Sequence, residues 1–295
     1  MENRGLLIGG LGILGFSLTL PMTRIAVAEF DPVIAGMGRA LISATLAGFM
    51  LWRQKAPFPG WHRVPSLLAV TLGVIIGYPF LTSIAMRTVP SAHGAVVAGL
   101  IPLATALFSF LRAHERPSRG FWLATGAGSA AVVLFALSEG GWALHGADIL
   151  LLVAVALCGV GYAEGGQLAR EIGGLQVVGW ALLFAVPIVA IPVARVIVVH
   201  GLHASAKAWA AFGYTGIISL FVAFWAWYHG LALGGVSRVG QIQLLQVFLT
   251  LGWAALLLGE KLSLGTVLTA IFVVGTVAVG RKMVVVRSES RSVAI

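Results

Sequence analysis

Three glutamine residues stand close together in an otherwise apolar stretch: Gln241, Gln243 and Gln246. On a helix, Gln243 and Gln246 share a face, whereas Gln241 lies about 200° from Gln243. Amide groups donate and accept hydrogen bonds without net charge, which suits the ammonium and carboxylate groups of a zwitterionic ligand. Hydrogen bonding between neighbouring apolar helices explains them equally well. The pattern therefore indicates either a binding site or a polar helix contact.

Two further polar rings stand in apolar surroundings. His93 lies at the start of one apolar stretch, where it could bind a carboxylate or respond to pH, or bond to nearby backbone. Tyr78 lies beside Pro79 in another, and a ring with a hydroxyl next to a proline kink suits an aromatic ligand. Otherwise the Tyr78 ring packs between helices. Both residues are candidates for ligand binding.

The charged residues deepest inside apolar stretches are Glu164 and Arg39. Glu164 could pair with a ligand ammonium group or carry a proton. It could instead form a structural ion pair with Arg39, because opposite charges in an apolar environment usually find each other. We favour the ion pair. Tyr162, two residues before Glu164, is a further candidate for ligand binding.

Aromatic residues cluster at 224–228, where Phe224, Trp225, Trp227 and Tyr228 follow one another closely. Such residues often form a belt at a membrane–water interface. Trp225 and Tyr228 are three residues apart, so they could instead form one wall of a cavity. The sequence leaves both arrangements open.

Residues that would indicate catalysis, metal binding or nucleic-acid binding are missing from the sequence. His114 and Glu115 lack the second histidine of a zinc site, and there is no Gly-x-Ser-x-Gly motif or phosphate loop. The single cysteine, Cys158, excludes an intrachain disulfide. The net charge of +9 is dispersed between apolar stretches rather than gathered in a patch. We therefore expect no enzyme, no metal, no cofactor and no nucleic-acid partner.

The elements that must position these residues are apolar helices. Of the 295 residues, 59% are hydrophobic and 10% are charged, against about 25% charged in soluble domains, so the surrounding solvent must be lipid. A span takes about 20 apolar residues. The chain is predicted to be all-α, with ten transmembrane helices at 5–23, 33–52, 66–86, 92–111, 120–137, 149–169, 175–194, 209–231, 239–258 and 263–280. Glycine pairs such as Gly73/Gly77 and Gly161/Gly165 fit close helix contacts.

The placement of Lys and Arg predicts the orientation of the chain. If the N-terminus is cytoplasmic, the inner segments carry thirteen of the nineteen, the outer segments carry five, and Arg39 lies within a span. Cytoplasmic loops are enriched in these residues, so both termini are predicted to be cytoplasmic, in the inner (plasma) membrane. Arg4, the apolar stretch 5–20 and the Ala26-Val27-Ala28 sequence resemble a cleaved signal peptide only loosely.

An internal repeat relates the two halves of the chain. The segment 91–102, which leads to Glu115-Arg116-Pro117-Ser118, has a counterpart that starts at 236 and leads to Glu260-Lys261-Leu262-Ser263. Five spans per half place the two glutamates on opposite sides of the membrane, so the predicted repeats, 1–138 and 147–283, are inverted. The tail 284–295 is predicted to be cytoplasmic. Inverted repeats place the substrate site at their interface near the bilayer midplane; a chance likeness of apolar helices is the alternative.

These two matched segments also carry a family resemblance. Residues 85–102 with 115–118 resemble the core signature of the EamA family of drug/metabolite transporters, and 228–231 with 259–263 are similar to its second copy. Within that family, the chain most resembles the YddG-type aromatic amino acid exporters. The resemblance implies ten helices around a central cavity, cytoplasmic termini and outward movement of metabolites. The second copy has Gln246 or Val247 where the first has Pro102, so the two halves need not bend alike.

We therefore expect a secondary transporter that exports amino acids, aromatic ones among them, or related small metabolites by alternating access. Its partners are the small-molecule substrate and the lipid bilayer, and no oligomeric state is predicted. A channel-like facilitator is the first alternative, and an intramembrane enzyme is the second. The predicted substrate-binding residues are Tyr78, His93, Tyr162, Glu164, Trp225, Tyr228, Gln241, Gln243 and Gln246.

Overall fold

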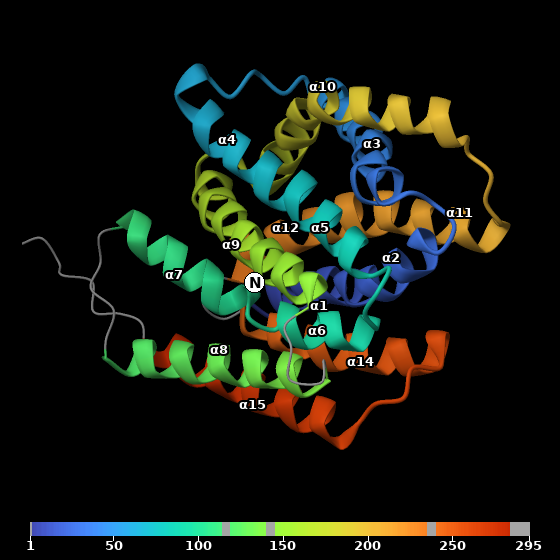
Figure 1. Cartoon of the computed structure of the whole chain (residues 1–295). Helices are drawn as coiled ribbons and strands as arrows, with labels where there is room; N and C mark the ends of the chain where they lie inside the picture. The colour runs from blue at the N-terminus through green and yellow to red at the C-terminus, as the bar shows by residue number, and fades with distance from the viewer. Residues whose placement is uncertain (1, 114–118, 140–144, 235–239, 284–295) are drawn as a thin grey trace, which may run out of the picture.

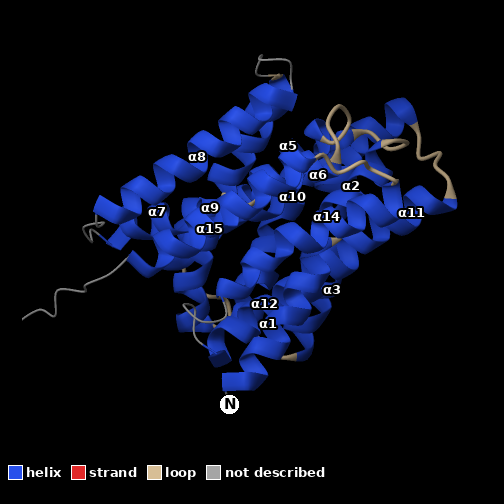
Figure 2. Ribbon diagram, turned by 90° about the horizontal axis from the view of Figure 1, so that it is seen from below, coloured by secondary structure: helices blue, strands red, loops and turns tan. Residues whose placement is uncertain are grey.

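The computed structural model describes residues 2–113, 119–139, 145–234 and 240–283, and in these residues all regular structure is helical (Figures 1 and 2). The Glu115 segment and the tail 284–295 lie outside the described residues. Seven helices are long and apolar enough to cross a membrane: Arg4–Val27, Ile34–Arg53, Trp61–Ala85, Ser91–Ser109, Gly146–Ile172, Gly174–His200 and Ala206–Gly230. Three shorter apolar helices occupy the remaining predicted spans: Trp122–Phe135, Ile242–Leu258 and Leu264–Val279.

The helices of the first half are α1 (Glu2–Ser17), α2 (Thr19–Val27), η1 (Ile34–Gly38), α3 (Arg39–Arg53), η2 (Trp61–Arg63), α4 (Val64–Val70), η3 (Thr71–Gly77), α5 (Tyr78–Ala85), α6 (Ser91–Ala98), α7 (Ile101–Ala113) and α8 (Arg119–Glu139). Those of the second half are α9 (Gly146–Ile172), α10 (Gly174–His200), α11 (Ala206–Gly213), η4 (Tyr214–Ala223), α12 (Phe224–Gly234), η5 (Gly240–Leu244), α14 (Leu245–Leu258) and α15 (Leu264–Met283). Both α9 and α10 are longer than the sequence predicts, at 27 residues each.

The two halves interlock rather than lying apart. The most extensive helix contacts pair α1 with α12, α8 with α15, α7 with α9 and α3 with α10, and each pair joins one helix from each half. Apolar side chains fill these contacts in two buried clusters, and Tyr162 packs against both. Each of the two clusters therefore contains residues from both halves.

Glycines set the closest of these helix contacts. A Cβ atom added to Gly230 of α12 would lie 2.6 Å from the Cα of Gly9 and 2.9 Å from the carbonyl oxygen of Gly5, both in α1. A Cβ on Gly73 of η3 would lie 3.2 Å from the backbone nitrogen of Gly161 in α9. The structure thus places Gly73 and Gly161 at a helix–helix contact, as the sequence pattern predicts.

A different polar contact lies at each end of the bundle. At one end of α9, Asp148 bonds to His93, and at the other end Glu171 pairs with Arg63. A 27-residue helix is about 40 Å long, so these two contacts lie on opposite ends of the molecule. The loops drawn in tan gather near α2, α6 and α11 (Figure 2).

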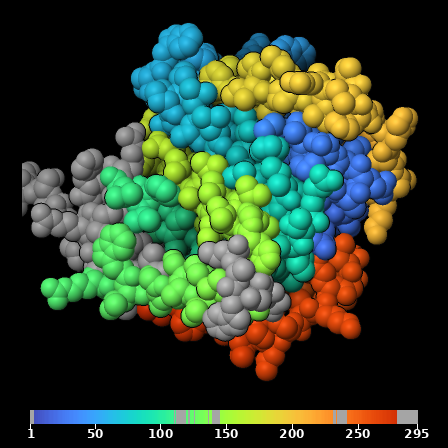
Figure 3. All heavy atoms as spheres, in the orientation of Figure 1, coloured from blue at the N-terminus to red at the C-terminus, as the bar shows by residue number. Residues whose placement is uncertain are grey.

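The outer surface of the bundle is apolar. Ile191, Val198 and Val199 of α10 are all exposed, and α10 lies along the edge of the molecule (Figure 3). Such a surface is stable when lipid chains cover it.

Candidate functional site

A buried cavity of about 30 Å³ lies between the two halves. The first half contributes seven of its lining residues: Phe16, Thr19, Leu20, Arg39, Val74, Tyr78 and Ile101. The second half contributes seven more: Cys158, Tyr162, Ser219, Leu220, Phe224, Gln243 and Gln246. Cys158 and Tyr162 belong to the middle of α9, so the cavity lies near the middle of the bundle's thickness.

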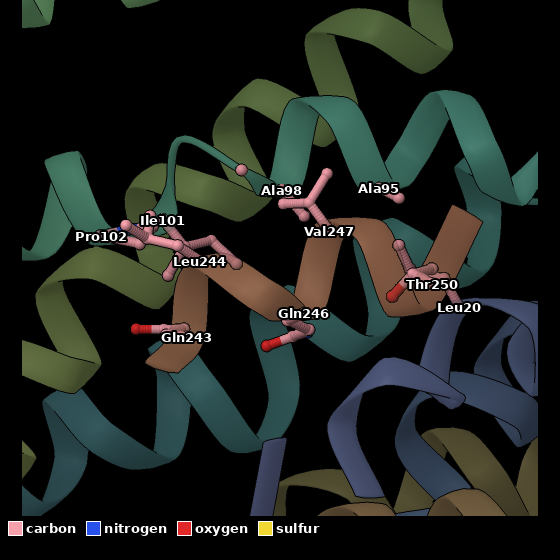
Figure 4. A pocket seen from close by; sticks show the side chains of 11 residues that line it. Leu20, Ala95, Ala98, Ile101, Pro102, Gln243, Leu244, Gln246, Val247 and Thr250 are labelled. Carbon is pink, nitrogen blue, oxygen red and sulfur yellow. The ribbon is translucent and has the colours of Figure 1, made fainter. Parts of the chain in front are cut away.

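Gln243 and Gln246 connect this cavity to a smaller one. The second cavity, of about 20 Å³, shares Leu20, Ile101 and both glutamines with the first, and Pro102 and Thr250 also line it. Figure 4 shows the two amide side chains extending the same way from the helix formed by η5 and α14. The shared face predicted for Gln243 and Gln246 agrees with this placement.

The two cavities are too small for a metabolite in this conformation. A water molecule needs roughly 10–15 Å³ measured in this way, so about 30 Å³ holds two or three waters at most. A cargo the size of an amino acid does not fit into this volume. The described cavity is therefore smaller than such a cargo.

Arg39 is the polar residue of greatest consequence in the cavity. It is 2% exposed, and its Nε and Nη1 atoms are buried without a hydrogen-bond partner among the described residues. Guanidinium groups stay charged in proteins, so Arg39 brings a full positive charge. The described lining residues include no Asp or Glu to neutralise it.

Aromatic rings also line the cavity and pack beside one another there. The rings of Phe16 and Phe224 meet edge to face at 4.7 Å, and Tyr162 meets Phe224 at 6.1 Å. Leu220 and Val74 extend the apolar surface. The cavity thus combines a charged, hydrogen-bonding part with an apolar, aromatic part, which is a common composition for sites that bind small organic molecules.

Three π-helical segments position the cavity residues. η1 ends at Gly38, η3 at Gly77 and η4 at Ala223, and the next residue in each case is a lining residue, namely Arg39, Tyr78 and Phe224. A π-helical turn shifts the direction of the side chains that follow it, and such turns are frequent at functional sites. Sequence periodicity did not predict these segments.

A close helix contact places Arg39 next to Tyr78. Gly36 of η1 approaches α5 so closely that a Cβ there would lie 2.9 Å from the carbonyl oxygen of Pro79. Because Arg39 and Tyr78 follow directly from the two contacting segments, their side chains reach the same cavity. The glycine at 36 is the sequence signal that could have indicated this contact.

Four of the predicted binding residues line the cavity: Tyr78, Tyr162, Gln243 and Gln246. The side chain of Gln241 lies outside the described part of the chain. Arg39, Cys158, Phe16 and Ser219 line the cavity but were not predicted as binding residues.

The remaining predicted residues lie elsewhere. Trp225 is 40% exposed and stacks on His229, so it does not form a cavity wall with Tyr228. Tyr228 is buried and stacks on Phe224 at 6.1 Å, behind the cavity. Glu164 is half-buried on α9 and is not a lining residue. The favoured ion pair between Glu164 and Arg39 is wrong: the ion pairs found among the described residues do not include it, because the guanidinium faces the cavity instead.

His93 belongs to a separate site at one end of the bundle. Its Nε2 lies 2.7 Å from Oδ1 of Asp148, and its ring packs on Phe135 at 5.1 Å. A cavity of about 370 Å³ lies beside this pair and is also lined by Lys261 and Thr266. The imidazole is thus held by a carboxylate of the other half, at the end of the bundle that carries the tan loops.

Glu260, one of the two repeated glutamates, caps a helix of the opposite half. Its carboxylate accepts hydrogen bonds from the backbone N–H groups of Ser91 and Ala92 at 2.8 Å each, and from the Ser91 hydroxyl at 3.0 Å. Arg24 lies 3.4 Å from the same carboxylate. A carboxylate at the first turn of α6 also interacts favourably with the helix dipole. This cap ties the two halves together at that end.

Comparison with known proteins agrees with this architecture. The chain is 41% identical over 288 residues to the uncharacterized transporter YdeK of Bacillus subtilis (strain 168), which covers 95% of this chain and 98% of the relative. One crystal structure of a protein at 20% identity superposes with a TM-score of 0.65 over 95% of this chain and 99% of its own, which shows a shared fold. The model of the EamA-like transporter family matches twice, at 3–137 and 145–280. The chain therefore belongs to the EamA-like transporter family.

Proposed function

We propose that this transporter is a secondary carrier that exports amino acids or related small metabolites by alternating access. The observation that carries the proposal is the central cavity to which both family-matched halves contribute equally. A site shared by two halves can open to either side when one half rocks against the other. Tyr78, Tyr162, Gln243 and Gln246 are the proposed substrate contacts.

The proposed topology has ten spans arranged as two inverted repeats, 1–138 and 147–283, with both termini and the tail 284–295 in the cytoplasm. Its support is that each family match contains five helical passages, an odd number. α8 and α15, which contain two of the shorter apolar helices, are 21 and 20 residues long. A helix of that length spans about 30 Å, the thickness of the hydrocarbon layer. The excess of Lys and Arg in alternate segments supports an inner-membrane orientation.

Aromatic amino acids are the proposed cargo, in the manner of YddG-type exporters. The ring edges of Phe16, Phe224 and Tyr162 offer the aromatic contacts that such a side chain would use. The polar side chains that line the cavity would meet the ammonium and carboxylate groups of the amino acid.

Transport into and out of proteoliposomes tests the proposal. Purified protein is reconstituted, and labelled phenylalanine is followed with and without unlabelled amino acid on the opposite side. A carrier gives saturable flux that the unlabelled cargo accelerates, since each crossing returns a loaded site. Flux that neither saturates nor shows counterflow would indicate a channel instead. Protein-dependent flux of no amino acid at all would contradict the proposed cargo.

A matched pair of variants ties the flux to the cavity. Tyr162→Ala removes a lining ring, whereas Trp225→Ala removes an exposed ring that does not line the cavity. We expect the first to lower the flux and the second to leave it unchanged. Equal effects of the two would argue that transport does not use this cavity.

A further inference from the structure

We infer that Arg39 is the anchor for a carboxylate group of the cargo, so that the carboxylate, rather than an ammonium group, is the obligatory element of recognition. The inference rests on the proposed function, which it deepens by naming the chemical class of the substrate. That class is a small organic acid with an apolar or aromatic body, of which an amino acid is one example.

The first support is the burial of an unpartnered charge. Arg39 is 2% exposed, and two of its guanidinium nitrogens have no hydrogen-bond partner among the described residues. Removing a charged group from water without a partner is strongly unfavourable. Buried charges in membrane proteins accordingly mark sites of function. An anionic ligand would supply the missing partner.

The second support is the contrast with other arginines of the structure. Arg24 lies 3.4 Å from Glu260, and Arg63 lies 3.0 Å from Glu171. Both of these residues are more exposed than Arg39 and yet have carboxylate partners. Arg39 is the more buried residue and faces a cavity with no carboxylate among its described lining residues. Arg24 and Arg63 therefore have carboxylate partners within the protein, whereas the guanidinium of Arg39 is available to a ligand.

The third support is the chemistry around the guanidinium. A guanidinium binds a carboxylate through two parallel hydrogen bonds. The Tyr78 hydroxyl and the amide groups of Gln243 and Gln246 line the same cavity and can donate further hydrogen bonds. An ammonium group would meet only neutral acceptors there. The apolar wall of Phe16 and Phe224 is left for the body of the ligand.

The backbone of Arg39 is held in place by contacts with the other half of the molecule. The Ser43 hydroxyl lies 3.0 Å from the Arg39 carbonyl oxygen and 2.6 Å from that of Gly216 in η4. Gly216 also allows α3 and η4 to approach closely, since a Cβ there would lie 3.2 Å from the Arg39 carbonyl oxygen. These contacts fix the start of α3 against the other half of the molecule.

Competition among three ring compounds tests which group is recognised. In proteoliposomes, unlabelled L-phenylalanine, 3-phenylpropionate and phenethylamine are added to the counterflow of labelled phenylalanine. The first two carry a carboxylate, and the third carries only an ammonium group. We expect both acids to inhibit and the amine to require at least a tenfold higher concentration. Inhibition by the amine as strong as that by 3-phenylpropionate would overturn the inference.

Variants at both ends of α3 provide the matched control. Arg39→Met should reduce the counterflow at least tenfold, and Arg39→Lys should retain part of it because the charge remains. Arg53→Met, at the exposed end of the same helix, should leave it unchanged. Unaltered counterflow in Arg39→Met would also overturn the inference.

A binding measurement separates this inference from the proposed function. In detergent, 3-phenylpropionate should raise the melting temperature of the wild-type protein, because a ligand that binds the folded state stabilises it, and phenethylamine should not. If no compound is transported but the acid still raises the melting temperature, the transport proposal fails and the carboxylate site stands. If the acid has no effect, or the amine has the same effect, the carboxylate site is wrong. This measurement does not depend on whether Arg39→Met folds.

Discussion

Gln243 and Gln246 are neutral, yet they place hydrogen-bonding groups among mostly apolar side chains. Both side chains reach the cavities between the halves, and Gln243 is buried. An amide side chain can keep a hydrogen bond to a ligand during a conformational change, because it can both donate and accept hydrogen bonds. The two glutamines therefore suit a site that must release its cargo as well as bind it.

Replacing Gln246 by Leu should weaken cargo binding without unfolding the protein, because the volume is nearly kept and the hydrogen bonds are lost. A typical hydrogen bond contributes about 0.5–1.5 kcal/mol, so KM for transport should rise about 2- to 12-fold. Gln167→Leu is the control, since Gln167 lies exposed on α9. The measurement is the concentration dependence of counterflow. An unchanged KM in Gln246→Leu would show that this amide does not contact the cargo.

Glu29 forms a cap between the halves, outside the spans. Its carboxylate accepts hydrogen bonds at 2.6 Å from both the hydroxyl and the backbone N–H of Ser205, which precedes α11. The hydroxyl hydrogen bond is the larger cause that lowers the pKa of Glu29 below 4.5, and the backbone hydrogen bond is the next. A lowered pKa in the folded state stabilises the fold above the unfolded pKa, and the stabilisation disappears as the pH falls through the folded value.

Glu29→Gln should therefore lower the melting temperature slightly at neutral pH, and the difference from wild type should shrink as the pH falls below 4.5 and through the lowered pKa of Glu29. Thermal denaturation in detergent across this pH range measures it. Ser205→Ala should reduce the effect of Glu29→Gln, because the pair acts through one contact. A difference that grows as the pH falls would contradict the lowered pKa.

At the scale of residues, the sequence indicated which polar residues line the cavity better than it indicated which residues they contact. Rarity in an apolar stretch was enough to select four residues that line the cavity: Tyr78, Tyr162, Gln243 and Gln246. The depth of a residue along a span, however, does not show which helix its side chain contacts. The sequence therefore favours an ion pair between Arg39 and Glu164, whereas in the structure Arg39 lines the cavity. Trp225 and Tyr228 do not share a cavity wall for a related reason: residues three apart differ by about 60° around a helix, and here Trp225 is 40% exposed whereas Tyr228 is buried.

The π-helical segments explain much of this difference at the scale of elements. The spacing of apolar residues predicts a regular helix. The segments η1, η3 and η4 each lie within an apolar run and do not interrupt it. Each segment adds residues to a turn and so turns the following side chains relative to a regular helix. The existence of a helix is thus readable from composition, whereas its internal irregularities depend on packing against the other half.

The contact between η3 and α9 should be sensitive to a single methyl group. A Cβ on Gly73 would collide with the carbonyl oxygen of Leu157 and crowd the backbone of Gly161. Because backbone atoms cannot move aside independently, Gly73→Ala should destabilise the protein by about 1–3 kcal/mol. Thermal denaturation of the purified protein measures the change.

Gly252→Ala provides the control for that substitution. Gly252 lies in α14, and a Cβ there would meet no atom within 4 Å. Alanine favours helix over glycine by up to about 1 kcal/mol, so this variant should be as stable as wild type or more stable. Equal destabilisation by both substitutions would indicate a general intolerance of alanine instead of a close contact at Gly73.

At the scale of the whole molecule, polar contacts join the two halves at both ends of the bundle. Glu260 caps α6 and Glu29 caps the start of α11, each across the boundary between the halves. Arg63 and Glu171 make a similar connection at the opposite end. Opening the cavity toward one end therefore requires the contacts at that end to separate while those at the other end persist.

Cys158 allows that movement to be observed, because it is the single cysteine of the chain and lines the cavity at 2% exposure. A membrane-impermeant maleimide does not fit into about 30 Å³, so it can react only after the cavity opens. Alternating access predicts slow labelling both from intact cells and from inside-out vesicles, and cargo should slow it from each side. Cys158→Ser should remove all labelling. A channel would label rapidly from both sides, and labelling from one side alone, at a rate that cargo does not change, would contradict the rocking of one half against the other.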